Sequence, residues 1–349
     1  MSTIPSTAFQ LKRYEGNPIL SPKAGSHWEC EVATNPGIWV DEETGKVQMV
    51  YRAAGNDPEH RVHLGLAVSE DGYNFKRVSD QPILSPQVGS IDNGCVEDPR
   101  VIKMDGWYFI TAATRPFPPG RYWLADNPEP KKREHFPESF PVGLRKNLTS
   151  THLYLTRDLA SGDWIRAGRL TNAKLDDRDV IIFPEKIGGK FHTIHRPMQW
   201  HGEGFPNKFP SIWIAACDDL LVWKDMKLLA KGDYAWEEKI GANNPPLKTD
   251  HGWLQIYHGV GADKQYRLGA MLLDLENPMK VTHRTPEPIY EPVEDYETKG
   301  FYNGVCFPCG HAVIDGTYFL YYGAGDVHCA VCTTPLKDFL DHLLQNPVA

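Results

Sequence analysis

TYFLYYGAGD, residues 317–326, is a run of aromatic and β-branched residues that starts after a turn signal and ends in small and polar residues. Such a run predicts a β-strand followed by a tight turn. Four earlier stretches share this design: KVQMVYRAAG (46–55), GWYFITAATR (106–115), KFHTIHRP (190–197) and GWLQIYHGVG (252–261). They follow one another at intervals of about 60 residues, with one longer interval after the second, and a fixed interval of this size is typical of a repeated structural unit.

A second series of turn-like stretches follows the first at a similar spacing. Its members are SEDGYNF from Ser69, TRDLASGDW from Thr156, CDDLLVW from Cys217, LLDLENP from Leu272 and TTPLKDF from Thr333. Two markers that repeat five times, with the longer interval in the same place, predict a unit of about four strands repeated five times. We therefore expect an all-β fold, a five-bladed β-propeller formed by residues 1–349 as one domain. The amphipathic tail, residues 335–345, predicts a short C-terminal helix.

The longer interval coincides with residues 116–150. Residues 116–141 contain seven prolines, both end residues included, and this segment has no strand pattern. We interpret it as an insertion loop in the second blade. Loops of this length are often lids or contact elements, which would make a homo-oligomer plausible, but a surface decoration is an equal alternative.

The bulk composition narrows the class of protein. The chain has 349 residues and a formal charge of −8, and its lack of a basic run argues against nucleic-acid partners. No apolar run approaches the ~18 residues that cross a membrane, which predicts no membrane partner. The N-terminal segment does not resemble a secretory signal, and the odd number of cysteines, seven, indicates reduced thiols. These features predict a cytoplasmic location.

Four cysteines have the spacing of a zinc site: Cys306, Cys309, Cys329 and Cys332. The alternative is that both pairs lie on strands of the fifth blade and that the thiols act as small apolar groups. The segment between the pairs keeps the blade pattern, so we favour the second interpretation and predict no metal.

Charged residues gather at the ends of the expected inner strands, where a propeller would bring different blades together. They are Arg52, Glu97, Asp98, Arg100, Arg178, Asp179, His195, Arg196, Lys239, His258 and Asp326. Inverting hydrolysis needs one carboxyl group as acid and a second as base. Phosphorolysis needs one acid and several cations, because phosphate is itself an anionic nucleophile that arginine binds well. One dominant acid among several cations favours phosphorolysis, whereas a surplus of carboxylates would favour hydrolysis.

An ordered series of stretches carries a resemblance to a known family. It comprises TNPG (34–37), YR (51–52), SEDGYNF (69–75), VEDPR (96–100), FPEKI (183–187), HRP (195–197), KIGA (239–242), GWLQIYHG (252–259), LLDL (272–275) and YYGAGD (321–326). The chain resembles glycoside hydrolase family 130, the β-mannoside phosphorylases and mannosidases. The resemblance runs from about residue 15 to about residue 335. It implies a five-bladed propeller and a glycosyltransferase-type phosphorylase that converts a β-mannosyl oligosaccharide and inorganic phosphate to α-D-mannose 1-phosphate, with no other cofactor.

The resemblance also implies roles for individual residues. Asp98 would be the proton donor, with the proton passing through a hydroxyl of the mannosyl ring. Phosphate would bind to Arg178, Arg196, Lys239 and His258. The mannosyl ring would bind to Asn35, Arg52, Tyr266 and Asp326. Tyr122 and Trp123 of the insertion are candidates for stacking on the second sugar.

Three features depart from the family pattern, and other functions stay open. Gly325 stands where the family usually has Ala, Asn243-Asn244 interrupts a loop beside Lys239, and the insertion is long. The alternatives in the same fold are an inverting β-mannosidase that uses water and a non-catalytic sugar-binding propeller. A furanosidase of the invertase or arabinanase type would need another carboxylate near the N-terminus, and no such motif surrounds Asn35.

Overall fold

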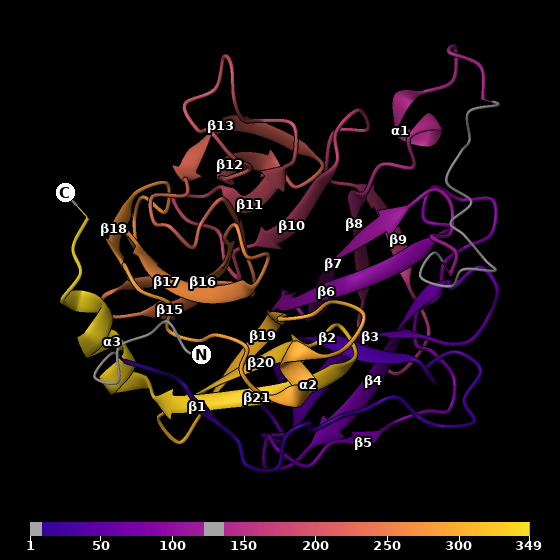
Figure 1. Cartoon of the computed structure of the whole chain (residues 1–349), viewed down its shortest axis with the longest axis horizontal. Coiled ribbons are helices and arrows are strands. Elements are labelled where there is room, and N and C mark those ends of the chain that lie inside the picture. Colours follow the sequence, from indigo (N-terminus) through magenta and orange to yellow (C-terminus); the bar gives the residue numbers. More distant parts are fainter. Residues whose placement is uncertain (1–8, 122–135, 349) are drawn as a thin grey trace.

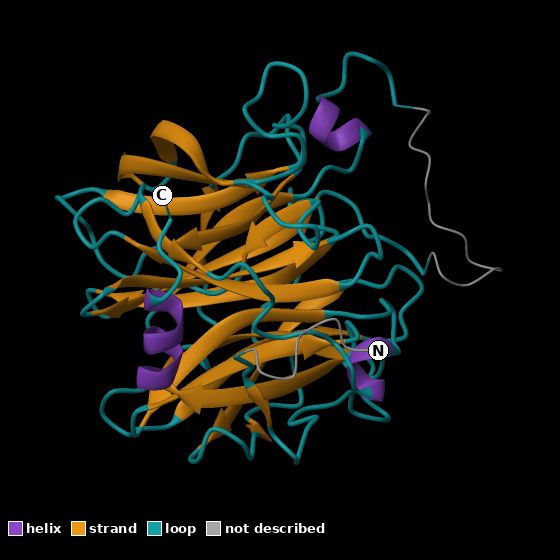
Figure 2. Cartoon of the chain, turned by 60° about the vertical axis from the view of Figure 1, so that its left-hand side comes forward, coloured by secondary structure: helices purple, strands orange, loops and turns teal. Residues whose placement is uncertain are grey.

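The protein, seen in a computed structural model that describes residues 9–121 and 136–348, is built almost entirely of antiparallel β-strands (Figures 1 and 2). The prediction of an all-β fold is confirmed. The strands form five antiparallel units that follow one another in chain order around a common centre (Figure 1). The first and second units are joined into one larger sheet by a single parallel bridge between Val62 and Cys95.

Each unit takes its strands from one continuous segment, with one exception. The first unit contains β2 (Val32–Val40), β3 (Val47–Ala54), β4 (Val62–Ser69) and β5 (Lys76–Arg77). The second contains β6 (Cys95–Met104), β7 (Trp107–Arg115), β8 (Ser150–Thr156) and β9 (Ile165–Arg169). The third contains β10 (Asp177–Ile182), β11 (Phe191–Pro197), β12 (Ile212–Asp219) and β13 (Val222–Ala230). The fourth contains β14 (Lys239–Ala242), β15 (Leu247–Thr249), β16 (Gly252–Val260), β17 (Tyr266–Leu273) and β18 (Val281–Arg284).

The fifth unit is the exception, because it joins the two ends of the chain. It contains β19 (Cys306–Ile314), β20 (Thr317–Ala324), β21 (His328–Pro335) and the N-terminal strand β1 (Lys12–Arg13). Lys12 pairs with Thr333, and Arg13 pairs with Cys332.

Three helices complete the described structure: α1 (Val142–Arg145), α2 (Asp295–Thr298) and α3 (Leu336–Leu344). The third confirms the predicted C-terminal helix, and its buried face contributes Phe339 and Leu343 to the core. The first lies in the segment between β7 and β8, where the insertion was expected. No helix in the described ranges is long and apolar enough to cross a membrane.

The two sequence markers fall on equivalent strands. The five apolar runs are the second strands of the units, β3, β7, β11, β16 and β20, and the second series falls on or directly after the third strands. The expectation that the runs are the innermost strands is wrong. The first strands, which contain Asn35-Pro36 and Asp98-Pro99, lie nearest the centre and contact one another: β2 contacts β6 and β19. Proline and polar residues within these strands hid them from a pattern search.

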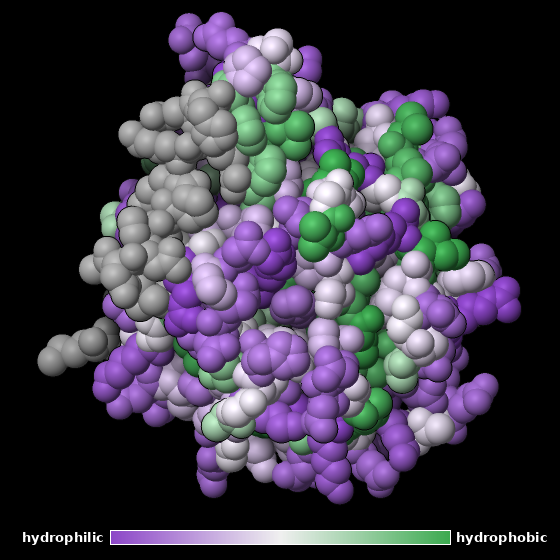
Figure 3. All heavy atoms as spheres, turned by 90° about the vertical axis from the view of Figure 1, so that its right-hand side faces the viewer, coloured by the Kyte–Doolittle hydropathy of each residue, from purple (hydrophilic) through white to green (hydrophobic). Residues whose placement is uncertain are grey.

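The core consists of apolar layers between neighbouring units. Separate clusters join the first unit to the second, the second to the third, the third to the fourth, the fourth to the fifth, and the fifth to the first. Tyr51 and Phe319, for example, share the layer between the first and fifth units. Each sheet is therefore buried on both faces, whereas the outer surface in Figure 3 is mostly hydrophilic with scattered apolar patches.

Among the described residues, four of the five units contain a buried carboxylate that links the last strand of the unit to its core by hydrogen bonds. Each carboxylate precedes the first strand of its unit, accepts a hydrogen bond from a core tyrosine and pairs with an arginine of the last strand. In the fourth unit Tyr257 donates to Glu237 at 2.7 Å, and Arg284 pairs with the other oxygen at 2.7 Å. The four sets are Glu29, Tyr51 and Arg77; Asp92, Tyr154 and Arg166; Glu237, Tyr257 and Arg284; and Glu297, Tyr322 and Arg13.

Candidate active site

An open cavity of about 310 Å³ lies where the first strands of the units meet. Eight of the nine residues that the sequence predicted as site residues line it. The wall consists of Asn35, Arg52, Glu97, Asp98, Arg115, Arg178, Asp179, Arg196, Met198, Lys239, Tyr266, Tyr302, Val305, Phe307 and Asp326.

Bulges in the first strands position three of the polar side chains. At Asn35, Asp98 and Asp179 the strand gains a residue relative to its partner, and the backbone is left-handed, with φ between 50° and 55°. Asn and Asp tolerate this conformation better than most residues, and a bulge redirects a side chain out of the regular alternation. The same position in the first, second and third units thus delivers one polar side chain each to the cavity.

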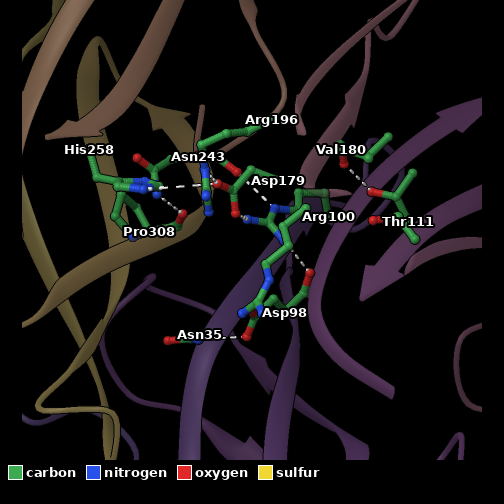
Figure 4. A network of polar contacts seen from close by, with 12 residues as sticks. Asn35, Asp98, Arg100, Thr111, Asp179, Val180, Arg196, Asn243, His258 and Pro308 are labelled. Carbon is green, nitrogen blue, oxygen red and sulfur yellow. Dashed lines mark hydrogen bonds and ion pairs between the residues drawn. The ribbon is translucent and has the colours of Figure 1, made fainter. Parts of the chain in front are cut away.

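Asp98 is held on one side only. Its Oδ1 accepts a hydrogen bond from Asn35 Nδ2 at 2.6 Å and lies 3.4 Å from Arg52 Nη1. Arg100 Nη1 donates to the Asp98 carbonyl at 2.7 Å, which fixes the backbone (Figure 4). Among the described residues nothing binds Oδ2, so this oxygen is available to a ligand in the cavity.

Arg52 is shared by three carboxylates. It lies 3.2 Å from Asp326, 3.4 Å from Asp98 and 3.6 Å from Glu97. Burial raises the pKa of Asp326, although Arg52 opposes this effect. A compact acidic region with one central cation can bind several sugar hydroxyls and keep its own geometry.

Two arginines form the opposite, basic region of the cavity, and each is oriented by a carboxylate. Arg178 binds Asp176 through Nε at 2.6 Å and Nη2 at 2.9 Å. Arg196 Nε donates to Asp179 Oδ2 at 2.6 Å. The remaining guanidinium nitrogens are thereby held in a fixed direction, which suits an oxyanion. Asp176 and Asp179 each keep a lowered pKa, because these arginines outweigh the effect of burial.

Lys239 and Tyr266 lie beside the arginines. Lys239 Nζ donates to the Tyr266 hydroxyl at 2.7 Å and lies 4.6 Å from the centre of the Tyr266 ring. Burial, and after it the charge of Arg196, lowers the pKa of Lys239 to about 7. A bound anion would therefore shift the protonation equilibrium of Lys239 towards the charged ammonium form.

His258 is the predicted site residue that does not line the cavity. Its side chain is fully buried behind Asp179, with Nε2 3.9 Å from Asp179 Oδ2 (Figure 4). Burial holds the pKa of His258 well below its ordinary value, so the expectation of a cationic imidazole at this position is not supported. Its part in phosphate binding stays a prediction, and in this geometry it would act through Asp179.

A polar network links the two regions beneath the cavity floor. Arg100 donates to the Asn243 carbonyl at 2.9 Å and lies 3.5 Å from Asp179, and Asn243 donates to the Pro308 carbonyl at 3.0 Å (Figure 4). Asn243 thus belongs to the packed interior, and the departure from the family pattern leaves Lys239 in the wall.

Several wall residues were missed as site residues by the sequence analysis. Glu97 and Asp179 were named among the charged residues at strand ends but were given no role, and Arg115, at the end of β7, was not named. Tyr302 comes from the loop before β19, and no motif marks it. Tyr122 and Trp123 lie outside the described residues.

The cysteine pairs do not form a metal cluster in the described structure. Cys306 and Cys309 lie on β19, Cys329 and Cys332 lie on β21, and all four are buried free thiols. No group of three or more potential metal ligands was found within the described ranges. Burial raises the pKa of Cys309 well above its ordinary value, which suits a thiol that packs as an apolar group.

Comparison with known proteins places the chain in a family. The model of glycoside hydrolase family 130, described as beta-1,4-mannooligosaccharide phosphorylase, matches residues 10–117 and 148–345. A 1,2-beta-oligomannan phosphorylase of Thermoanaerobacter sp. (strain X514) is 35% identical over 336 residues, covering 94% of this chain and 98% of the relative. A beta-1,4-mannooligosaccharide phosphorylase of Ruminococcus albus is 32% identical over 346 residues, covering 96% and 91%.

The fold has a solved counterpart as well. The beta-1,2-mannobiose phosphorylase from Listeria innocua, solved as a complex with beta-1,2-mannobiose, superposes with a TM-score of 0.76. The superposition covers 96% of this chain and 99% of the other at 26% identity. The two matched segments of the family model leave out residues 118–147, within the predicted insertion.

Proposed function

This chain belongs to glycoside hydrolase family 130, and on that premise we propose that it is an inverting β-mannoside phosphorylase. It transfers the mannosyl group of a β-mannosyl oligosaccharide to inorganic phosphate, and it releases α-D-mannose 1-phosphate and a shortened sugar. One observation carries the proposal: Asp98, which keeps one carboxyl oxygen without a partner among the described residues, shares a cavity with the cations Arg178, Arg196 and Lys239.

In this proposal Asp98 supplies the proton. A phosphate oxygen forms a bond to the anomeric carbon as the glycosidic bond breaks, and the leaving oxygen takes up a proton. Asp98 gives this proton through a hydroxyl of the mannosyl ring, and Asn35 holds the other carboxyl oxygen in place. Positioned proton transfer of this kind contributes typically 10²–10⁴-fold to a rate.

Arg178, Arg196 and Lys239 bind the phosphate and neutralise its charge, so no general base is required. The cavity also contains Glu97, Asp179 and Asp326, and a surplus of carboxylates was the expected sign of hydrolysis. Each of these has an arginine partner: Arg52 pairs with Glu97 and Asp326, and Arg196 pairs with Asp179. The pairing keeps the pKa of Asp179 low, which makes it a poor base for water, whereas burial raises the pKa of Asp326. Phosphate as the nucleophile is therefore supported by the three cations rather than by the pairing of the carboxylates.

Asn35, Arg52, Tyr266 and Asp326 would hold the mannosyl ring between the two regions. Arg52 and Asp326 offer one donor and one acceptor 3.2 Å apart, which matches a hydroxyl group. Tyr266 lines the same cavity, and its hydroxyl accepts a hydrogen bond from Lys239 of the basic region.

The five antiparallel units would be the blades of a single propeller domain, with the cavity at its axis. This proposal is supported by the apolar layers, which join every unit to its two neighbours in a closed cycle. A homo-oligomeric state and a cytoplasmic location stay predictions.

The deciding experiment is a set of β-mannobioses and longer β-mannosides, incubated with and without inorganic phosphate. We expect turnover only with phosphate, and we expect α-D-mannose 1-phosphate as the product, identified by its phosphorus resonance. Undiminished cleavage in phosphate-free buffer would show a mannosidase instead. Binding without cleavage of any mannoside would show a sugar-binding protein.

A further inference from the structure

The segment 299–305, which joins α2 to β19, forms the edge of the cavity and rests directly on the turn after β20. Tyr302 N donates to the Gly325 carbonyl at 3.4 Å, and Gly325 N donates to the Val305 carbonyl at 3.1 Å. On its other side, the Gly304 carbonyl accepts a hydrogen bond from Tyr266 N at 2.9 Å. The segment is therefore fixed by its backbone between the fourth and fifth units.

Gly325 allows this close approach. Its φ is 59°, and a Cβ atom at this position would lie 2.5 Å from the Lys299 carbonyl oxygen and 2.8 Å from the Tyr296 carbonyl oxygen. Backbone atoms cannot yield as a flexible side chain does, so any larger residue at 325 would push the segment away. Asp326, a cavity residue, follows directly, so the position of the segment is tied to the acidic region.

The segment brings the side chain of Tyr302 to the cavity mouth. The ring lines the cavity although the residue is 52% exposed, and it meets Tyr266 edge-on with centroids 6.2 Å apart. In the described part of the chain its hydroxyl has no hydrogen-bond partner. A large aromatic side chain left half exposed at the edge of a polar cavity offers an apolar face to whatever occupies the mouth.

We propose that Tyr302 is the platform on which the leaving sugar of the substrate rests, and that Gly325 sets its position. This inference rests on the proposed function, which assigns the acidic region to the mannosyl ring and the basic region to phosphate. The mouth beside Tyr302 is then the place left for the second pyranose. Tyrosine suits it because the ring is large and loses little conformational freedom on binding, and a pyranose presents a face of C–H groups.

The test uses the synthetic direction, in which α-D-mannose 1-phosphate and free mannose as acceptor release phosphate. In Tyr302→Ala, we expect the KM for the acceptor to rise about tenfold. This corresponds to about 1.4 kcal/mol, which is more than a contact at the rim of a binding site usually contributes. The KM for α-D-mannose 1-phosphate stays within about twofold. Tyr302→Phe keeps the ring and stays close to the parent protein. Asn303→Ala, an exposed neighbour outside the cavity wall, is the matched control.

Gly325→Ala tests the positioning and should raise the acceptor KM in the same direction. An acceptor KM that is unchanged in Tyr302→Ala would overturn the inference, as would an equal rise in both KM values or a Tyr302→Phe variant as impaired as Tyr302→Ala. If Gly325→Ala does not fold, the Tyr302 variants decide alone. Calorimetric binding of β-mannobioses without phosphate separates the two proposals. A parent protein that binds these disaccharides but releases no phosphate in the synthetic direction ends the proposed function. Weaker disaccharide binding by Tyr302→Ala than by the parent protein still supports the platform.

Discussion

Lys239 leads to a prediction about how phosphate affinity changes with pH. Its ammonium group is buried beside Arg196 and donates to Tyr266, and its pKa is lowered from 10.5 to about 7. At 1.36 kcal/mol per pKa unit, the pocket favours the neutral amine by roughly 5 kcal/mol relative to water. A bound phosphate anion reverses this preference, because it supplies the opposite charge that the empty cavity lacks.

The direction and size of the effect follow from the protonation equilibrium. In the phosphate-free protein about half of Lys239 is charged at pH 7, about a tenth at pH 8 and about a hundredth at pH 9, for a pKa near 7. If phosphate binds to the charged form, the dissociation constant rises about twofold at pH 7 and about tenfold at pH 8, relative to a side chain that is always charged. Lys239→Arg provides that reference, because the guanidinium group stays protonated over this range.

The assay is calorimetric titration of phosphate into the parent protein and into Lys239→Arg between pH 6 and pH 9. The ionisation of phosphate itself affects both proteins equally, so it cancels in the ratio of their dissociation constants. The readout is the slope of this ratio with pH, because the absolute size of the ratio also includes the effect of the different shape of arginine. A ratio that stays constant within twofold from pH 6 to pH 9 would refute the reasoning, since Lys239 would then not titrate in this window or not bind phosphate.

Three further predictions concern the acid, the arginines and the buried carboxylates. Asp98→Asn should lower kcat by about 10²–10⁴-fold with oligosaccharide binding retained in calorimetry; more than a tenth of the parent activity would contradict its role. Arg178→Ala or Arg196→Ala should weaken phosphate binding about 10–100-fold, the size of a lost charge-assisted hydrogen bond, with oligosaccharide affinity unchanged; unaltered phosphate affinity in both variants would remove that assignment. Arg284→Met removes the cation that pairs with the buried Glu237, so the free energy of unfolding in denaturant should fall by about 3–5 kcal/mol. Lys224→Met, at an exposed ion pair, is its control and should change stability by less than about 0.5 kcal/mol.

The repeated second strands could be predicted from sequence because each is buried on both faces. Residues such as Tyr51, Ile194 and Tyr321 therefore form continuous apolar and aromatic runs that a strand pattern detects. The first strands could not be found in this way, because Asn35-Pro36 and Asp98-Pro99 interrupt them at the bulges. The polar residues that hid these strands are the ones that reach the cavity.

The candidate site, like the fold, could be predicted from the sequence only in part. Asp98, Arg178 and Lys239 stand in short motifs and could be proposed before the structure. Tyr302 could not, because its position depends on backbone contacts with Gly325 across the fifth unit. The sequence also could not predict that His258 lies behind the cavity wall. A sequence gives the order of residues along a strand but not how deeply each side chain is buried.

The pairing of β1 with β21 has a consequence for how the chain matures during synthesis. The strand β1 is made before all the other described strands, and it has no partner strand until β21 has been made, because Arg13 pairs with Cys332. Until then the fifth sheet lacks its outer edge and the buried Glu297 lacks its counter-ion. A circular permutation that places residues 9–15 after α3 would turn this late, distant encounter into a nearby one, and refolding of the permuted chain should be faster than that of the natural order.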